Sequence, residues 1–329
     1  KPTTTSVALR HFIHLHRRLP AVYHYYDLRR RKMRLREIHH YDTYVPILSD
    51  LEVERTWDEA VDLVCTLSIG EHGIDVDFSG TSPVCGHGIN VPLTYTQAYA
   101  SFGVRCVVGN DVPNNAGSLG LVRVAAPQGS ILNAPRPAAV SARHAIGQML
   151  PDVVLGCLEE PLGGRVPAEG ASCLFGPVFL GGRGVIPGSD SEPFVVNAFY
   201  AGGTGGRPGK DGLDCTAFPS GVRSTPVEIT ENTAPLIIWR KEFRPGSGGA
   251  GEFRGGVGQI MEFGHAADEA FAVSKMFDRI THPPRGRQGG ENGQEACASP
   301  LKKPGVRHDC SPLKSVFADC FLRVCLFPA

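Results

Sequence analysis

Glycine is the feature that most limits how this chain can fold. The chain has 40 glycines among 329 residues, and more than half of them follow Gly181. Many gather in two loops: Gly202–Gly212 reads GGTGGRPGKDG, and Gly246–Gly258 reads GSGGAGEFRGGVG. Only glycine adopts positive φ freely and leaves room for close backbone approach. We therefore expect the second half of the chain to be short strands joined by tight glycine-rich turns.

The middle of the chain, about residues 65–293, shows both helical and strand-like patterns. Residues 74–78 alternate like a strand. Helical spacing predicts helices over 96–108 and 143–162, the second kinked or broken at Pro151. Further strands are predicted after Val166, at Phe194–Tyr200, Val227–Glu231 and Leu236–Phe243. Together these patterns predict an α+β fold with a β-rich, glycine-rich second half.

The first segment, residues 1–64, has a different composition. Between Lys1 and His40 it holds ten basic and two acidic residues and no glycine. A loose apolar stripe over Ala21–Ile38 follows Pro20, which suits a first helical turn. Residues 50–64 read as a second helix because acids stand near its start. We therefore predict a separate helical segment that packs weakly on the rest.

The last segment, residues 295–329, changes again. It contains four of the ten cysteines and no periodic apolar face. Such a segment cannot offset an ordering entropy of roughly 1–2 kcal/mol per residue. We therefore expect a disordered tail and three parts in all: 1–64, 65–294 and 295–329.

Charge and cysteine usage narrow the class of protein. The formal net charge is zero, so charge gives no reason to expect a nucleic acid or a membrane partner. No signal peptide opens the chain, and no apolar run approaches the roughly 18 residues that a membrane span needs. The cysteines form neither a C-x-x-C pair nor a typical zinc spacing. These features predict reduced thiols, a cytoplasmic location and no metal site.

Seven short boxes follow one another through the middle segment. They are DFSGTS at Asp77–Ser82, NVPL at Asn90–Leu93, DVPNNAGS at Asp111–Ser118, VAAPQGS at Val124–Ser130, the two glycine loops, and TPVEITE at Thr225–Glu231. In their order along the chain they resemble the C-terminal part of the hydantoinase B family over about two thirds of the chain. Members of that family are partner subunits of ATP-dependent hydrolases that open hydantoin or 5-oxoproline rings. Ser224 departs from the pattern, because the family often has Asn there.

The resemblance implies a truncated subunit of a cyclic-amide hydrolase. The family's N-terminal half, which carries a His/Asp metal cluster in relatives, is expected before Cys65 and is not recognisable there. ATP and a divalent metal are therefore expected only in a complete complex with a hydantoinase A-type ATP-binding subunit. The chain alone is expected to bind no cofactor and to be inactive, although its substrate class is a cyclic amide.

Box membership singles out carboxylates as acid/base candidates. Opening an amide ring needs an electrophilic carbonyl and a protonated leaving nitrogen. Asp211 and Glu228 are the predicted catalytic residues, with Asp75, Asp77 and Glu231 as further candidates. For each of them the alternative is a turn or strand-end residue that caps backbone amides.

The glycine loops supply the predicted substrate or subunit-interface residues. A phosphate loop is excluded, because Lys210 is followed by an acid rather than by Ser or Thr. A glycine-rich turn with basic side chains can still bind an anion. The alternative is a loop whose glycines only allow tight packing. The predicted contact residues are Gly203, Thr204, Gly205, Arg207, Lys210 and Arg254.

The N-terminal segment resembles another family. LPAVYHYYDLR at Leu19–Arg29 and HHYDTYVP at His39–Pro46 are similar to an internal stretch of oligoendopeptidase F, a zinc peptidase of the thimet-oligopeptidase clan. No H-E pair occurs in the chain, so the H-E-x-x-H zinc motif is missing and peptidase activity is not expected. A join near Val64 suggests a fusion or an assembly artefact. The alternative to an enzyme subunit is thus a non-catalytic interaction module or such an artefact.

Overall fold

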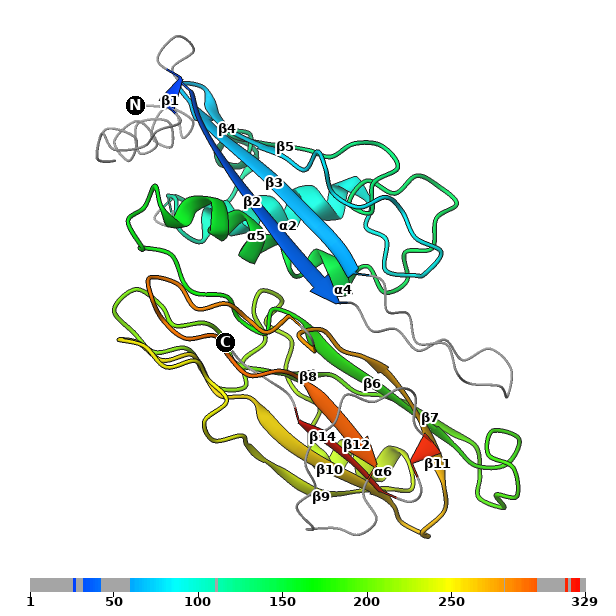
Figure 1. Cartoon of the computed structure of the whole chain (residues 1–329). Helices are drawn as coiled ribbons and strands as arrows, with labels where there is room; N and C mark the ends of the chain where they lie inside the picture. Colours follow the sequence, from blue (N-terminus) through cyan, green and yellow to red (C-terminus); the bar gives the residue numbers. More distant parts are fainter. Residues whose placement is uncertain are drawn as a thin grey trace. The chain divides into compact units, whose positions relative to one another are not determined.

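The chain forms two compact units in the computed structural model (Figure 1). The structure describes residues 26–27, 32–42, 60–109, 112–280, 282–300, 317–318 and 321–325. Unit 1 contains the described residues up to Tyr41 and those from Val61 to Pro167. Unit 2 contains Asp42, Ala60 and the described residues from Ala168 onward. The division between the units therefore falls inside the segment that the sequence predicted to be one domain.

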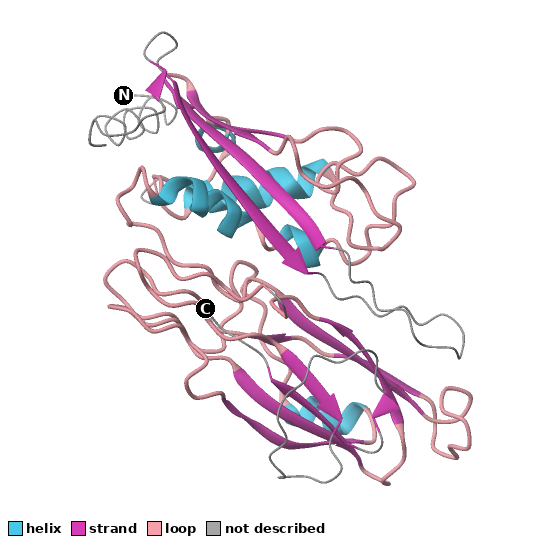
Figure 2. Cartoon of the chain, viewed as in Figure 1, coloured by secondary structure: helices cyan, strands magenta, loops and turns pink. Residues whose placement is uncertain are grey.

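Unit 1 is built on a five-stranded sheet whose strands follow one another in chain order. The pairs β1–β2 and β3–β4 are antiparallel, whereas β4 and β5 run parallel. Figure 2 shows the helices of this unit on one face of the sheet. The strands are β1 (Tyr26–Asp27), β2 (Lys32–Asp42), β3 (Ala60–Gly70), β4 (Gly73–Asp77) and β5 (Val122–Ala125).

The described residues of unit 1 form four helices: α2 (Leu93–Arg105), α3 (Ala116–Leu119), α4 (His144–Gly147) and α5 (Leu150–Glu159). The helix predicted over 143–162 is divided into α4 and α5, and Pro151 stands in the first turn of α5, where its missing N–H has no cost. Helices α2 and α5 pack closely, since a Cβ on Gly103 would lie 2.9 Å from the Cα atom of Pro151.

Where the structure describes the N-terminal segment, it has strands in place of the predicted helices. Strands β1 and β2 occupy much of Ala21–Ile38, and β3 begins at Ala60. The sequence KMRLR at Lys32–Arg36 alternates charged with apolar residues, which is the period of a strand. The rest of residues 1–59 lies outside the described residues.

The predicted join near Val64 lies inside strand β3. Leu63 and Cys65, on either side of it, are both fully buried. Both flanks of the join therefore contribute to one core, so Leu63 does not pack weakly as predicted. The packing of the residues before Val61 lies outside the described side chains.

Unit 2 contains two sheets that share an aromatic core. Their strand orders are β12-β14-β10-β9 and β13-β11-β6-β7, with β8 also paired to β6. The ring centroid of Phe179, on β6, lies 4.7 Å from that of Phe263 on β10, and Tyr200 lies 6.0 Å from Phe263. The elements are β6 (Leu174–Gly181), β7 (Phe194–Asn197), β8 (Tyr200–Ala201), α6 (Val227–Thr233), β9 (Leu236–Phe243), β10 (Gln259–His265), β11 (Phe271–Met276), β12 (Cys297–Pro300), β13 (Phe317–Ala318) and β14 (Phe321–Cys325).

Three sequence predictions for unit 2 need correction. The strand predicted at Val227–Glu231 is helix α6, which follows Pro226 and has Glu228 in its first turn, near the positive end of the helix dipole. The tail predicted to be disordered contains three strands, and β14 pairs with both β10 and β12. Cys297, which was predicted to be a reduced thiol, forms a disulfide.

A buried ion pair joins distant parts of unit 2. Glu169 and Arg279 are 1% and 2% exposed, and Arg279 NH1 lies 3.0 Å from Glu169 Oε2. Arg279 also donates to the carbonyl oxygens of Gly170 and Ala171, while Arg285 Nε donates to Glu169 Oε1 at 2.7 Å. Burying two charges costs free energy unless each is well paired, so the cluster tolerates the loss of neither partner.

Glu169→Gln is expected to destabilise unit 2 by about 3–5 kcal/mol, because the buried Arg279 loses its counter-charge while side-chain volume is kept. Urea unfolding measures the change. Glu192→Gln is the matched control: its partner Arg183 is 64% exposed and Glu192 is 86% exposed, so the loss should stay below about 1 kcal/mol. Equal effects of the two substitutions would contradict this prediction.

Candidate functional site

The loop Gly202–Gly212 lies between other backbone segments of unit 2. Ala171 N–H donates to the Gly203 carbonyl at 3.0 Å on one side. On the other side, Gly256 N–H donates to the Thr204 carbonyl at 2.9 Å, and Thr204 N–H donates to the Leu213 carbonyl at 3.0 Å. The loop is therefore held on both sides by main-chain hydrogen bonds.

The glycines of this region are required by space. A Cβ on Gly205 would overlap the carbonyl group of Ala168, and a Cβ on Gly212 would overlap the Thr204 carbonyl. The second glycine loop packs in the same way, since a Cβ on Gly256 would overlap the Leu213 carbonyl. At these positions the tight-packing interpretation is therefore supported directly by the structure.

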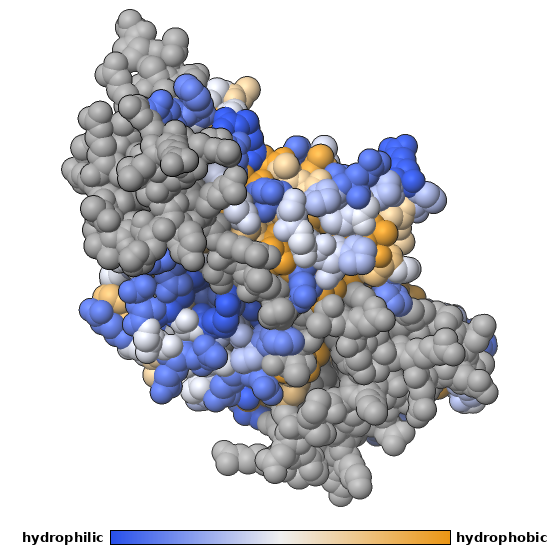
Figure 3. Space-filling model, turned by 45° about the horizontal axis from the view of Figure 1, so that its top comes forward, coloured by the Kyte–Doolittle hydropathy of each residue, from blue (hydrophilic) through white to orange (hydrophobic). Residues whose placement is uncertain are grey.

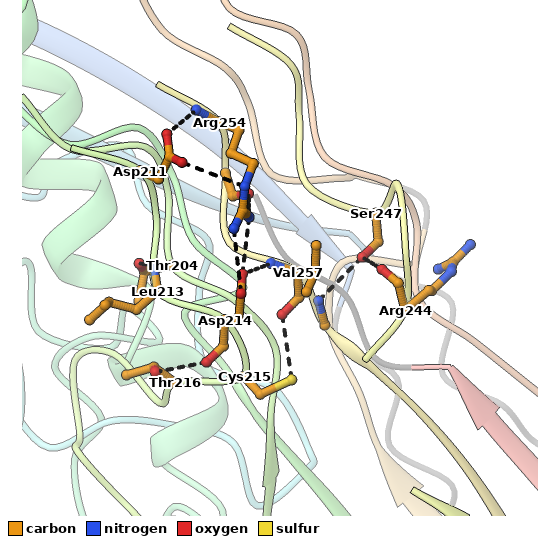
Figure 4. Close-up of polar contacts among 12 residues, drawn as sticks. Thr204, Asp211, Leu213, Asp214, Cys215, Thr216, Arg244, Ser247, Arg254 and Val257 are labelled. Carbon is orange, nitrogen blue, oxygen red and sulfur yellow. Dashed lines mark hydrogen bonds and ion pairs between the residues drawn. The ribbon is translucent and has the colours of Figure 1, made fainter. Parts of the chain in front are cut away.

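Asp214 and Arg254 connect the two glycine loops (Figure 4). Arg254 NH1 lies 3.0 Å from Asp214 Oδ1, and Arg254 NH2 donates to Oδ2 at 3.4 Å. Asp214 Oδ1 also accepts the Val257 N–H at 2.6 Å. Asp211 Oδ1 accepts the Arg254 N–H at 3.0 Å, and its Oδ2 lies 3.6 Å from Arg254 Nε. Two carboxylates thus hold one guanidinium.

Electrostatics reinforce this network. The hydrogen bond from Arg254 is the main cause that lowers the pKa of Asp214, and the Val257 N–H adds to it. Asp211 is the more accessible acid, with 54% of its side chain exposed compared with 30% for Asp214. Asp214 is therefore an anchor, whereas Asp211 presents its carboxylate to solvent beside a cation.

The remaining predicted loop residues divide into two kinds. Thr204 is 8% exposed, and its hydroxyl accepts the Leu213 N–H at 2.8 Å, so it braces the loop. Arg207 Nε and NH2 donate to the Asp211 carbonyl at 3.0 and 2.7 Å. Lys210 is exposed at the tip of the loop, where its main chain pairs with Arg207. Cations thus gather at the end that carries Asp211.

The second predicted catalytic residue, Glu228, lies on a different element. It is exposed in the first turn of α6, near Lys241. Burial lowers the pKa of Lys241, and the charge of Glu228 opposes that shift. No hydrogen bond or ion pair joins Glu228 to Asp211, both of which are described residues. Their catalytic roles remain predictions.

The other candidate carboxylates have structural contacts. Asp75 accepts two hydrogen bonds from Arg123, at 2.6 and 3.0 Å, across strands β4 and β5. Asp77 Oδ1 accepts the N–H and hydroxyl of Ser79 in a turn. Glu231 Oε1 accepts the Ile238 N–H at 2.9 Å. For Asp77 and Glu231 the structure supports the capping alternative, whereas Asp75 pairs with the side chain of Arg123 instead.

Sequence reasoning missed Asp214, Ser247 and Cys215 of this region. Ser247 is fully buried, donates to the Arg244 carbonyl at 2.6 Å and accepts the Gly258 N–H at 3.2 Å. Burial, assisted by Asp214, raises the pKa of Cys215 to about 12, so its thiol is a poor nucleophile. No spacing in the sequence could have paired Asp214 with Arg254, since 40 residues separate them.

Among the residues that the structure describes, no three His, Cys, Asp or Glu side chains converge as a metal site requires. These residues therefore do not fit the divalent metal that the resemblance implies for a complete complex. In the same part of the chain, every helix is too short or too polar to span a bilayer.

The sequence of this α+β chain shows which class of protein it belongs to, that of the hydantoinases and oxoprolinases. The sequence profile of the Hydantoinase B/oxoprolinase family matches residues 20–315, and the chain belongs to this family. The match includes residues 20–64, so it covers most of the segment predicted to be a peptidase remnant. That prediction of a second family gains no support.

Curated relatives are much longer than this chain. It is 30% identical over 249 residues to the 5-oxoprolinase of Dictyostelium discoideum, which covers 74% of this chain and 18% of that protein. It is 31% identical over 237 residues to 5-oxoprolinase 1 of Arabidopsis thaliana, with 71% and 17% covered. The chain thus spans less than a fifth of either relative.

Two solved structures share the fold. The ATP-dependent caprolactamase from Pseudomonas jessenii matches with a TM-score of 0.69 and 20% identity, over 98% of this chain and 53% of that one. A nucleotide-free acetone carboxylase matches with a TM-score of 0.67 and 18% identity, over 90% and 44%. At such identities the likeness shows the fold alone.

Gly205→Ala is expected to destabilise unit 2 by about 1–3 kcal/mol or more, because the added methyl meets a backbone carbonyl that cannot rotate away. Gly251→Ala is the control, since its Cβ would meet its nearest atom at 3.6 Å, an ordinary contact. Urea unfolding midpoints measure both. An unchanged midpoint for Gly205→Ala would contradict the packing argument.

Asp214→Asn is expected to remove stability that depends on pH. The folded-state pKa of Asp214 is lowered, so its contribution is present above the unfolded value of about 3.9 and is lost as pH falls through the folded value. Wild type should therefore exceed the variant in stability at pH 7, and the difference should shrink as pH falls below the unfolded value of about 3.9. Asp190→Asn, at an exposed acid, serves as control, and a pH-independent difference for Asp214→Asn would contradict the assignment.

Proposed function

We propose that the chain is the part of a hydantoinase B-type subunit that positions a cyclic amide, such as 5-oxoproline or a hydantoin, for ATP-dependent ring opening. The observation that carries the proposal is the exposed Asp211 carboxylate, placed beside Arg254 and Arg207 on a backbone that glycine packing holds rigid. A fixed acid next to fixed cations suits a small polar substrate. Family membership supports the substrate class.

The reaction adds water across the ring C–N bond. Water attacks the carbonyl carbon, the C–N bond breaks, and the ring nitrogen takes a proton as it becomes the amine. In this proposal Asp211 exchanges that proton, and the cations Arg207 and Lys210 attract the substrate carboxylate or imide oxygen. Glu228 is a second candidate for proton exchange if a complete complex brings α6 to the substrate. When bound to a partner, ATP supplies activation of the carbonyl oxygen.

A hydantoinase A-type ATP-binding subunit is the proposed partner. The described residues contain no phosphate loop, because Lys210 is followed by Asp211. An amide carbonyl is unreactive towards water, and positioning alone does not change that. The chain by itself is therefore proposed to hold a substrate without opening it.

A non-catalytic interaction module is the second candidate. One specific observation favours it: the guanidinium of Arg254 is already held by Asp214 and the Gly255 carbonyl. An arginine paired in this way stabilises the loop and is not available as a free cation for a substrate. In this alternative, the glycine loops form a rigid surface against which a partner subunit docks.

The activity test uses the full chain alone and after co-expression with a hydantoinase A-type subunit. Alone, with or without ATP, it is expected to open neither 5-oxoproline nor N-methylhydantoin. With the partner, ATP-dependent ring opening is expected, and Asp211→Asn should lower kcat by about 10²-fold or more. The measurement is product formation by chromatography.

Asp190→Asn is the control, because it removes a carboxylate that is also exposed, from another loop. Ring opening by the chain alone, abolished by Asp211→Asn, would contradict the need for a partner. Co-purification of the partner with no ring opening would instead favour the interaction module.

A further inference from the structure

His265 ends strand β10, where the chain leaves one sheet of unit 2 for the other. Strand β10 belongs to the sheet with β9 and β14, and β11, which begins at Phe271, belongs to the sheet with β6. Histidine is a hydrophilic residue, and such residues make up much of the described surface on the face drawn in Figure 3. His265 is instead 2% exposed. Its imidazole is thus a buried titratable group at the connection between two sheets.

The two ring nitrogens of His265 determine its protonation state. Nδ1 accepts the main-chain N–H groups of Ala267 and Glu269, at 3.2 and 3.4 Å. A ring nitrogen that accepts a hydrogen bond carries no proton, so the single proton of the neutral ring is on Nε2. Nε2 is buried and forms no hydrogen bond with a described residue. The turn that follows β10 therefore requires the neutral imidazole.

A second polar contact lies in the same turn. The Glu269 carboxylate accepts the Ser189 hydroxyl at 2.5 Å and the Ser191 hydroxyl at 2.7 Å. Both serines belong to residues 182–193, the loop that joins β6 to β7. These hydroxyls hold the pKa of Glu269 below its usual value, so the carboxylate stays charged in the range where histidines titrate. Glu269 thus fastens the loop to the turn that His265 braces.

The surroundings of the imidazole favour its neutral form. Burial lowers the pKa of His265, and the carboxylates of Glu269 and Asp268, which are the charges that act on it among the described residues, oppose that shift. Its neighbours on β7 and β9, Phe194 and Leu236, are uncharged. The folded chain therefore keeps the ring neutral at pH values where an exposed histidine, with a pKa of about 6.5, is already protonated.

Protonation reverses the role of Nδ1. An imidazolium carries an N–H on both ring nitrogens, so Nδ1 can no longer accept the N–H groups of Ala267 and Glu269. The new charge also attracts the Glu269 carboxylate, because a buried cation needs a counter-charge. A carboxylate drawn to the imidazolium loses its hydrogen bonds with Ser189 and Ser191. One proton from solvent thus breaks the turn and the fastening of the loop together, and no covalent bond changes.

We propose that His265 is a pH-sensitive switch for residues 182–193. When its imidazole is protonated, the Glu269 carboxylate leaves the two serine hydroxyls for the imidazolium, and the loop is released. The folded-state pKa of His265 is lowered, so the closed arrangement is fully stable above the ordinary value of about 6.5 and is lost as pH falls through the folded value. The switch goes beyond the proposed ring opening and is independent of it, because neither Asp211 nor Arg254 takes part.

Hydrogen–deuterium exchange of the full chain, followed by mass spectrometry, tests the switch between about pH 8 and about pH 5. In the loop, the amides of Arg183 and Ile186 are hydrogen-bonded and so protected. After correction for the pH dependence of chemical exchange, their protection should fall by about tenfold or more at the lower pH, because opening restores the ordinary pKa of His265. Peptides that cover α2 in unit 1 should keep their protection. Unchanged protection of the loop would overturn the proposal.

Three variants assign the effect to its residues. His265→Asn keeps an acceptor near the position of Nδ1 but cannot be protonated, so its loop should stay protected at the lower pH. His72→Asn, at an exposed histidine of unit 1, is the matched control and should behave as wild type. Glu269→Gln keeps an acceptor for the serines and removes the counter-charge, so the loss of protection should move to lower pH. A loss of protection in His265→Asn like that of wild type, or an unmoved midpoint in Glu269→Gln, would overturn the proposal.

Discussion

Direct contact between main chains is the constraint on which unit 2 depends. Around the glycine loops, peptide groups of segments 168–171, 203–206 and 212–214 lie against one another, with no space for a Cβ atom at Gly205 or Gly212. Such packing excludes side chains, so neighbouring segments can be held only by main-chain hydrogen bonds and by side chains that reach in from the periphery. The buried Glu169–Arg279 pair does this on one side, and the Asp214–Arg254 pair on the other.

The same constraint shapes the candidate site. Because the backbone cannot shift, Asp211 and the cations beside it keep one arrangement, which is a requirement of both substrate positioning and specific docking. As a consequence, several polar side chains of the loops already form hydrogen bonds within the unit. Thr204, Asp214 and Ser247 brace main-chain groups, which leaves Asp211 and Lys210 as the more accessible polar residues of the first glycine loop.

Unit 1 shows that the family boxes mainly serve the fold. Asn90, in the NVPL box, is fully buried; its amide donates to three carbonyl oxygens and accepts the Cys85 N–H. Asn115 caps helix α3 by accepting from Gly117 and Ser118. The DFSGTS box forms a turn, through Asp77, and ties it to β3 through Thr81. The boxes that reveal family membership are thus sites where backbone geometry leaves little choice of residue.

The sequence by itself determined whatever depends on neighbouring residues. Glycine loops, the strand at Gly73–Asp77, helix α2 and the helix break at Pro151 follow from local spacing and from the backbone preferences of Gly and Pro. Only the tertiary structure decided the rest. Strands β2 and β14 exist because distant strands complete their hydrogen bonds, and Asp214 meets Arg254 across 40 residues of chain. Contacts between residues so far apart leave no periodicity in the sequence, and for that reason they could not be predicted from it.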